Sequence, residues 1–193
     1  FASEIKSILE TGIPKEVDYI ALNEYLSYNF IPPPRTLFKN ISQVLPGTWQ
    51  KYTKDSCLTH RWWDLSELKS EDKSEEEWTE EFNSTLDDAV RIRLRADVPF
   101  GAFLSGGVDS STVVGLMAKH LKDPVKTFCI GFHDPKYDES PYAQEASERF
   151  KTEHVLEKVE ANMIDTWPKV IRHCDQPHGD VSFMPTLKVA ELA

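Results

Sequence analysis

The sequence has little cysteine and no recognisable metal-binding pattern. Its 193 residues include three cysteines, Cys57, Cys129 and Cys174. These are widely spaced, odd in number and form no Cys-x-x-Cys pair, so neither a disulfide framework nor a zinc site is indicated. The six histidines show no His-x-x-x-His or Glu-x-x-His pairing, which argues against a catalytic metal centre built on histidine. We expect reduced thiols.

Positive charge and long apolar runs are also scarce. The chain has 22 Lys and Arg against 32 Asp and Glu, a net charge of −10. This balance argues against a duplex nucleic-acid binder, whose affinity comes from basic residues that neutralise phosphates. No apolar run approaches the ~18 residues of a membrane span, and the first six residues lack a signal peptide's apolar stretch. We expect a cytoplasmic protein with neither nucleic acid nor membrane as a partner.

What is present is an ordinary globular composition, with 40% hydrophobic residues, enough for a buried core in one domain or one and a half. The local composition changes near residue 66. Residues 13–60 carry turn punctuation and short apolar runs, typical of the loop-and-strand edge of a domain. Within them, Pro46-Gly47 marks a turn before a predicted strand at Thr48–Tyr52.

An acidic segment follows at Ser66–Glu81, where eight acidic residues face two lysines. Its first part reads as an exposed linker and its second part as the start of a helix. Ser74 and Glu77 fit a capping box, and apolar residues then recur at helical spacing. We place a domain boundary between Asp64 and Ser74.

Strands and helices alternate beyond this boundary. The predicted strands are Phe100–Leu104, Val125–Phe132 and His154–Val159, and the predicted helices are Thr112–Leu121, Ser140–Phe150, Met163–Trp167 with a restart at Pro168, and one from about Phe183 onward. The first strand is apolar enough to be covered on both faces. Strands that alternate with helices of about 10–15 residues indicate βαβ units and a parallel sheet, hence an α/β fold.

The most informative stretch runs from Leu104 to Ser111, Leu-Ser-Gly-Gly-Val-Asp-Ser-Ser. It follows the first predicted strand and opens a helix, the place where open parallel sheets bind ligands. Two glycines permit close backbone approach, serines offer hydroxyl donors, and the helix start presents free N–H groups. An acid within such an anion cradle is repulsive unless a cation lies between, so Asp109 indicates Mg²⁺ bridging to phosphate.

Two alternatives bear on this stretch. Gly-Gly can simply make a turn, and Ser or Asp can simply cap a helix. The order of buried strand, two glycines, three serines and an acid favours the phosphate interpretation. No Lys-Ser or Lys-Thr follows the glycines, so the stretch is not the P-loop of a kinase or GTPase.

Ser-Gly-Gly-Val-Asp-Ser-Ser resembles the pyrophosphate loop of the N-type ATP pyrophosphatases, and its setting, Arg93–Leu104, resembles the glutamine-hydrolysing asparagine synthetases in particular. Further segments are similar to that family in the same order. They are Ala21–Ser27, Ile31–Thr36, Leu45–Gly47, Arg61–Asp64, Ile130–Phe132, Tyr137–Ala143, Asp175–Pro177 and Pro185-Thr186. The resemblance therefore runs along nearly the whole chain.

The resemblance implies a doubly wound parallel sheet of the ATP-pyrophosphatase (adenine nucleotide alpha hydrolase-like) type, preceded by the end of an Ntn-type glutaminase domain. On this basis we expect a glutaminase part at residues 1–65, an acidic linker at 66–74 and a synthetase part at 75–193. The implied reaction is adenylation of the aspartate side chain by ATP with loss of pyrophosphate. Ammonia from glutamine then displaces AMP from the β-aspartyl-AMP intermediate, a ligase reaction that gives asparagine.

The resemblance also assigns binding residues, and it leaves the catalytic residue unassigned. Those expected at ATP and pyrophosphate are Leu104, Ser105, Gly106, Gly107, Val108, Asp109, Ser110, Ser111, Ile130 and Gly131, with Asp109 also at magnesium and with Leu104, Ile130 and Gly131 framing the adenine. Ile130 can instead be an ordinary core residue. Asp138 and Glu139 either cap a helix or line the nucleotide cleft, and Asp175 and Asp180 lie either in a solvated turn or near magnesium or the acceptor.

The sequence also departs from the family pattern. Family glutaminase domains use an amino-terminal cysteine as nucleophile, whereas this chain begins with Phe1 and reaches its first cysteine at Cys57. We therefore expect a fragment that does not hydrolyse glutamine by that route. Three matters stay open: a related amidotransferase or ring-forming synthetase that adenylates another carboxylate, an inactive nucleotide-binding module, and a homodimer.

Overall fold

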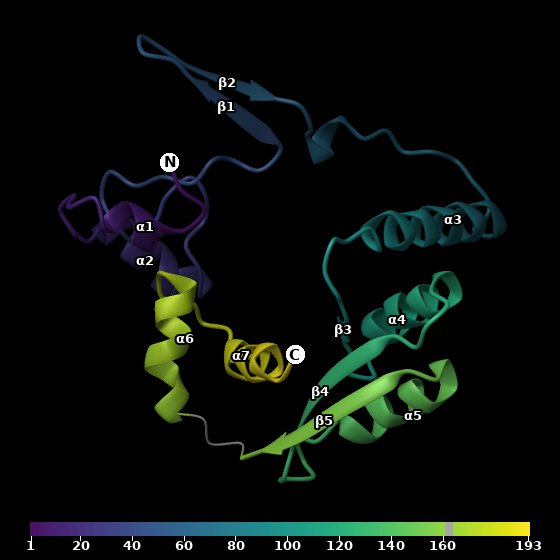
Figure 1. The fold of residues 1–193 in the computed structure, drawn as a ribbon. Coiled ribbons are helices and arrows are strands. Elements are labelled where there is room, and N and C mark those ends of the chain that lie inside the picture. The colour runs from purple at the N-terminus through teal and green to yellow at the C-terminus, as the bar shows by residue number, and fades with distance from the viewer. Residues whose placement is uncertain (161–163) are drawn as a thin grey trace. The chain divides into compact units, whose positions relative to one another are not determined.

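The computed structural model describes residues 1–160 and 164–193. Contacts divide the chain into two compact units, Phe1–Glu71 with Asp165–Val181, and Asp72–Ile164 with Ser182–Ala193. Each unit is described by itself (Figure 1). Met163, where we placed the start of a helix, lies outside the described residues.

The first unit contains short helices and one hairpin. Its elements are α1 (Ile5–Leu9), α2 (Tyr19–Tyr28), β1 (Thr48–Tyr52), β2 (Cys57–Arg61), the 3₁₀ turn η1 (Leu65–Glu67) and α6 (Trp167–Cys174), which follows the turn η2 (Ile164–Thr166). The strands β1 and β2 pair antiparallel, from Thr48 opposite Arg61 to Tyr52 opposite Cys57. The predicted strand at Thr48–Tyr52 is confirmed.

The helix α2 was missed by our reading of this region as loops and strands. Its cap is Asp18, whose carboxylate accepts hydrogen bonds from the backbone N–H groups of Ile20 (2.8 Å) and Ala21 (3.2 Å). The helix ends at Asn29, which adopts a left-handed conformation with φ of 63°. These start and stop signals are local and were available in the sequence.

Residues 165–181 belong to the first unit although they come late in the chain. The bonds that tie them to it run from Ile5 N to Asp175 Oδ2 (2.7 Å), from Lys6 Nζ to Asp175 Oδ1 (2.8 Å), from Leu37 N to Gln176 Oε1 (3.0 Å) and from Gly179 N to Asn29 O (2.8 Å). The first unit is therefore built from two separate stretches of sequence.

The second unit is a parallel sheet with helices on both faces. Its elements are α3 (Glu75–Arg93), β3 (Ala102–Phe103), α4 (Val108–His120), β4 (Lys126–Phe132), α5 (Ser140–Phe150), β5 (Glu153–Val159) and α7 (Phe183–Leu192). The strand order is β3-β4-β5. Figure 1 shows α4 and α5 on one face of the sheet and α7 on the other. The predicted α/β alternation with a parallel sheet is confirmed, and no helix of the described residues is long and apolar enough to cross a membrane.

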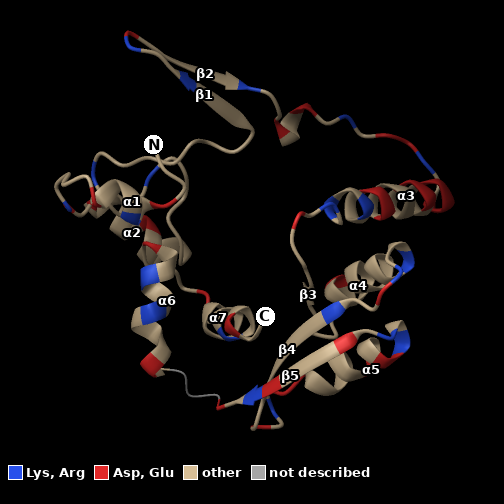
Figure 2. Ribbon diagram, in the orientation of Figure 1, with Lys and Arg blue, Asp and Glu red and all other residues tan. Residues whose placement is uncertain are grey.

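The helix α3 begins as its capping box predicts. Ser74 Oγ accepts from Glu77 N (3.2 Å), and the Glu77 carboxylate accepts from Ser74 N (2.8 Å). Figure 2 shows acidic residues at the start of α3 and basic residues at its end, a polarity that the helix dipole favours. The acidic residues in the first turn of α3 therefore stabilise the start of this helix.

The core of the second unit lies between the sheet and the helices α4 and α5. One cluster joins Leu104, Val114, Cys129 and Ala143. The expectation that Phe100–Leu104 is a strand covered on both faces is wrong in part. The strand is limited to Ala102–Phe103, and while Leu104 is 1% exposed, Phe103 on the opposite face is 49% exposed, because α7 covers that face only partly.

Candidate functional site

The glycine- and serine-rich loop leaves the sheet at the carboxyl end of β3. Leu104 N donates to Phe128 O (2.9 Å), which extends the pairing with β4 by one residue. The chain then turns, and α4 begins at Val108 with Gly107 as its N-cap residue. The loop therefore lies at the carboxyl edge of the parallel sheet, where the helix start and the strand ends meet.

Gly106 is required by both backbone conformation and packing. Its φ is +81°, a region that favours glycine. A Cβ built on Gly106 would lie closer than 3.0 Å to backbone atoms of Tyr142 and Ala143, in the first turn of α5. The loop consequently rests directly on the start of α5, a contact that no pattern in the sequence reveals.

Two serine hydroxyls of the loop, those of Ser105 and Ser110, are joined to one another. Ser105 Oγ and Ser110 Oγ lie 2.9 Å apart, and Ser105 Oγ accepts from Gly107 N (3.3 Å). Ser110 Oγ also accepts from Ser105 N (3.3 Å). These bonds hold the loop against the first turn of α4, so Ser105 and Ser110 are positioned together.

The start of α4 offers hydrogen-bond donors. The N-cap residue is Gly107, and in the part of the chain that the structure describes it provides no side-chain cap for the helix. The first N–H groups of a helix have no partner inside the helix. Asp109 lies in this first turn and is exposed, and Val108 beside it is 83% exposed. The combination can bind an anion.

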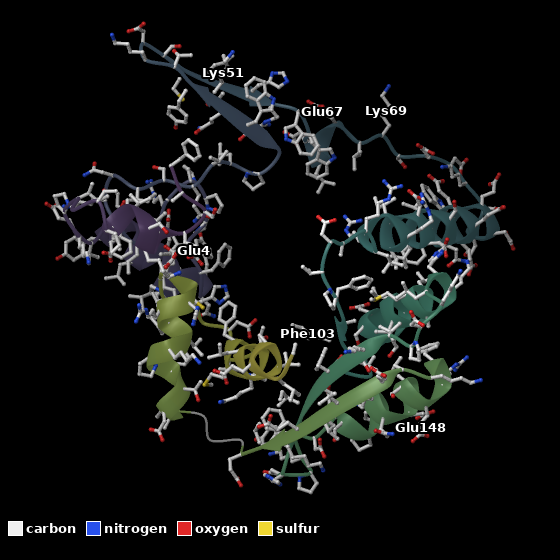
Figure 3. All side chains as sticks on the ribbon, in the orientation of Figure 1. Glu4, Lys51, Glu67, Lys69, Phe103 and Glu148 are labelled. Atoms are coloured by element: carbon white, nitrogen blue, oxygen red, sulfur yellow. The ribbon has the colours of Figure 1, made fainter. Side chains whose placement is uncertain are left out.

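A pocket of about 230 Å³ adjoins the loop. Its walls come from the end of β3, the middle of β4 and one side of α7, and its lining residues are Phe103, Leu104, Ser105, Phe128, Cys129, Ile130, Pro185, Thr186 and Val189. Figure 3 labels Phe103 within this unit. Three residues predicted for the site, Leu104, Ser105 and Ile130, thus line one pocket.

Sequence reasoning missed the contribution of α7 to this pocket. Pro185, Thr186 and Val189 line it, although we had noted Pro185-Thr186 only as part of the family resemblance. The helix itself was predicted from about Phe183, but the face of the sheet against which it packs could not be read from its sequence. Phe103 and Phe128 were missed for a similar reason, since an apolar residue in a strand is ordinarily core.

Gly131 does not line this pocket but lies buried against Asp138. A Cβ at Gly131 would lie 2.8 Å from Asp138 Oδ1. That oxygen accepts from Phe132 N (3.3 Å) and Ser140 N (3.1 Å), while Asp138 Oδ2 pairs with Lys158 Nζ (2.8 Å). Lys158 and these hydrogen bonds hold the pKa of Asp138 far below its ordinary value. The bond from Ser140 N agrees with the capping alternative for Asp138, while Glu139, the N-cap residue of α5, is exposed and forms no side-chain cap bond with the described residues.

Asp175 and Asp180 belong to the first unit, whereas the loop belongs to the second. The solvated-turn interpretation is wrong for Asp175, whose side chain is 10% exposed and paired with Lys6. Asp180 is exposed, and its N–H donates to His178 Nδ1 (3.2 Å). Asp175 is thus a residue that joins two segments of the first unit.

The described residues contain no group of three or more His, Cys, Asp or Glu side chains that could hold a metal ion. Asp109 contributes a single carboxylate. A magnesium ion at this place therefore requires oxygen ligands from a bound phosphate as well, which agrees with the preference of Mg²⁺ for one or two carboxylates together with substrate phosphates.

A glycine-rich loop at the carboxyl end of a parallel sheet, opening a helix, is typical of α/β proteins that bind nucleotides or phosphates. Comparison with known families makes this specific. Residues 81–193 match the asparagine synthase family and residues 1–63 match the glutamine amidotransferase domain. The chain belongs to the asparagine synthase family.

Individual relatives agree with this assignment. Over 204 residues the chain is 38% identical to a putative glutamine-hydrolyzing asparagine synthetase 2 of Methanocaldococcus jannaschii, covering all of this chain and 38% of that protein. Over 194 residues it is 32% identical to glutamine-hydrolyzing asparagine synthetase 1 of Bacillus subtilis, covering all of this chain and 30% of that protein. Amidase chyE of Penicillium rubens is 30% identical over 209 residues, covering 98% of this chain and 31% of that protein. The chain thus spans about a third of the length of these curated relatives.

Proposed function

We propose that this chain is part of an ATP-dependent ligase that forms asparagine from aspartate, with glutamine as nitrogen donor. The observation that carries the proposal is the loop Ser105–Ser111, which joins β3 to the start of α4 and rests on α5 in a chain of the asparagine synthase family. On this proposal the sheet is the first part of a doubly wound ATP-pyrophosphatase fold. Residues 1–65 are the end of an Ntn-type glutaminase domain, 66–74 a linker and 75–193 the start of the synthetase domain.

The loop is proposed to bind the pyrophosphate part of ATP. The backbone N–H groups of Gly106 and Val108 and the hydroxyls of Ser105, Ser110 and Ser111 are the donors, while Gly107, whose N–H is bonded to Ser105 Oγ, lets the backbone come close to the phosphates. Because hydrogen bonds already hold the side chains of Ser105 and Ser110 and the backbone of Gly107, the loop stabilises negative charge on the leaving pyrophosphate at little reorganisation cost. Positioning and charge stabilisation are then the main contributions of this chain.

Asp109 is proposed to hold Mg²⁺ together with the phosphates. Its exposed carboxylate next to a helix N-terminus fits that role, because the cation removes the repulsion between carboxylate and phosphate. Bound magnesium supplies neutralisation of the charge that develops on pyrophosphate.

The pocket beside the loop is proposed to take the adenine. Leu104, Ile130 and Val189 supply apolar walls, and Thr186 supplies a hydroxyl. The backbone of Ile130 lies near the end of the neighbouring strand and lines this pocket, where backbone groups can recognise the edge of a ring. In the overall reaction the aspartate side-chain carboxylate takes AMP from ATP and releases pyrophosphate, and ammonia then displaces AMP.

The experiment is to incubate the complete protein with ATP, Mg²⁺ and glutamine or ammonia, and to follow pyrophosphate release with and without aspartate. Release that depends on aspartate, with formation of asparagine, is expected. Release that depends on a different carboxylate instead would replace the asparagine assignment by the related-synthetase alternative. No release with any carboxylate, despite ATP binding, would leave a nucleotide-binding module.

The role of Asp109 is tested by calorimetric titration with ATP and Mg²⁺. Asp109→Ala is expected to weaken magnesium-dependent ATP binding by about tenfold or more, because it removes the only protein carboxylate proposed to hold the cation. Asp123→Ala is the matched control, since Asp123 is also an exposed acid but lies in the turn after α4. Equal affinities for the two variants would contradict the assignment of Asp109.

A further inference from the structure

The proposed pyrophosphate loop, Ser105–Ser111, packs against the first turn of α5. As described above, Gly106 lies directly on the backbone of Tyr142 and Ala143. Ala143 is fully buried in the cluster with Leu104 and Val114. A shift of the first turn of α5 therefore cannot occur without moving Gly106, because no space separates the two backbones.

The position of that turn is set by Asp138. Its carboxylate accepts from Ser140 N at the start of α5 and from Phe132 N at the end of β4. Tyr142 N donates to Glu139 O (3.1 Å), so the helix grows directly from the residues that Asp138 holds. Ser140 is itself buried, which leaves the start of α5 little freedom to rotate.

Lys158 fixes the other side of Asp138. It lies on β5 opposite Gly131 in the strand register, and its Nζ is 2.8 Å from Asp138 Oδ2. The Asp138 side chain is 9% exposed and the Lys158 side chain 45%, so the carboxylate of this ion pair is shielded from solvent while the lysine is not. Gly131 makes room for it, because any side chain there would collide with the Asp138 carboxylate.

We propose that Asp138 and Lys158 form a clamp that positions the pyrophosphate loop, acting through the first turn of α5 on Gly106. The clamp ties together the ends of β4 and β5 and the start of α5, all at the carboxyl edge of the sheet. Asp138 and Lys158 are positioning residues that need not touch ATP. The inference rests on the proposed function, since it takes the loop to be the ATP-binding element.

The decisive variant is Lys158→Met, which removes the ion pair but leaves the hydrogen bonds of Asp138 to the backbone. Its matched control is Lys119→Met, which removes the Lys119–Asp87 pair (2.7 Å) between α4 and α3, at the end of α4 away from the loop. Lys158→Arg tests rescue, because it keeps the charge. The free energy of unfolding of each variant is measured by urea denaturation, so that affinity is compared among folded proteins.

Lys158→Met is expected to raise the calorimetric Kd for ATP with Mg²⁺, and the KM for ATP, by about tenfold, as a small displacement of binding groups does. The KM for aspartate is expected to change little. Lys158→Arg is expected to recover most of the affinity, and Lys119→Met to leave it within about twofold of wild type even where it lowers stability, as loss of an exposed ion pair does.

Equal ATP affinities for Lys158→Met and Lys119→Met would overturn the clamp, as would a rise in the KM for aspartate without one for ATP. The proposed function fails separately. If the wild type binds ATP but forms no asparagine, the proposed reaction is wrong while the binding comparison still decides the clamp. If the wild type does not bind ATP at all, both proposals fall.

Discussion

Gly106 combines two constraints that can be separated by experiment. Gly12 has nearly the same φ, +85° against +81°, yet a Cβ on Gly12 meets no atom of the described residues within 4 Å. Gly12→Ala is therefore expected to cost about 1–2 kcal/mol, the penalty of the left-handed conformation alone. Gly106→Ala is expected to cost more, because the new methyl group collides with the backbone of Tyr142 and Ala143.

Urea denaturation measures both costs, and calorimetry measures ATP binding by the same proteins. Gly106→Ala is expected to lose ATP affinity while Gly12→Ala keeps it. Similar stability losses for the two variants would contradict the packing of the loop on α5.

At this scale the sequence showed the loop well but not what supports it. The glycines, serines and Asp109 are consecutive, so their common location follows from a strand before them and a helix after them. The contact of Gly106 with Tyr142 joins residues far apart in the chain, and nothing local indicates it. Asp138 was correctly considered as a cap, but its pairing with Lys158 depends on the register of β4 and β5.

Between β4, β5 and α5 runs a chain of polar side chains. Thr152 Oγ1 donates to Ser147 Oγ (3.0 Å), Thr127 Oγ1 lies 2.8 Å from Thr152 Oγ1, and His154 Nδ1 lies 2.9 Å from Thr127 Oγ1. Since the Thr152 proton is already used, Thr127 must donate to Thr152, and His154 Nδ1–H must donate to Thr127. The network therefore assigns the Nδ1–H tautomer to His154, with Nε2 bare.

This hydrogen-bonded network predicts that the stability of the protein depends on pH. Nε2 of His154 is buried without a hydrogen-bond partner in the described residues, so its protonation would place a donor where no acceptor is available. Burial accordingly lowers the pKa of His154 below the ordinary histidine value. Because the folded state favours the neutral ring, this contribution to stability is complete above the unfolded pKa of about 6.5 and is lost as the pH falls below it.

Urea denaturation between about pH 7.5 and pH 5 checks this expectation around the ordinary histidine pKa. His154→Gln, which cannot be protonated, should flatten the decline in unfolding free energy at acid pH. His133→Gln is the control, because His133 is an exposed histidine of the same unit. A decline of the same size in all three proteins would refute the role of His154.

Of the helices, the sequence located α3 and α5 well, whereas α2 was missed although Asp18 caps it. The predicted helix at Ser140–Phe150 coincides with α5, and α3 starts at the capping box. The bounds of β3 were harder to predict, because this strand has only two residues and is defined by its pairing with β4. The exposure of Phe103 likewise depends on how much of the sheet α7 covers, which is a property of packing and not of periodicity.

At the scale of the whole molecule, the contacts of residues 165–181 with the rest of the first unit allow a prediction for limited proteolysis. Residues 68–73 are described, lie outside helices and strands and are mostly exposed, and Figure 3 labels Glu67 and Lys69 in this region. A glutamate-specific protease is expected to cut first after Glu67 and Glu71. The piece preceding the cut should remain bound to the rest, because the contacts of residues 165–181 hold it.

Gel filtration of the cut protein without denaturant tests this expectation, and co-elution of the two pieces is the expected result. Asp175→Ala removes the bonds to Ile5 and Lys6 and should promote their separation. Separation of the pieces in the wild-type protein would show that these contacts do not hold the first unit together.

The acidic segment near residue 70 indicated a boundary. The sequence did not indicate that residues 165–181 belong to the first unit. The partners Lys6 and Asp175 are individually unremarkable, as are Asn29 and Gly179. An ordinary loop reading of Asp175–Asp180 was reasonable because the sequence shows turn residues and not what they touch. Only the long-range contacts identify this stretch as part of the first unit.

The division of the first unit between two stretches has a consequence for biosynthesis. A ribosome that has made residues 1–71 must add about 110 more to reach Val181, which takes about 5.5–22 s at about 5–20 residues per second. By then all three strands of the parallel sheet, the last ending at Val159, have been made. Translation thus makes the sheet available to fold while the first unit still lacks its closing segment, and a pause before residue 165 would lengthen that interval.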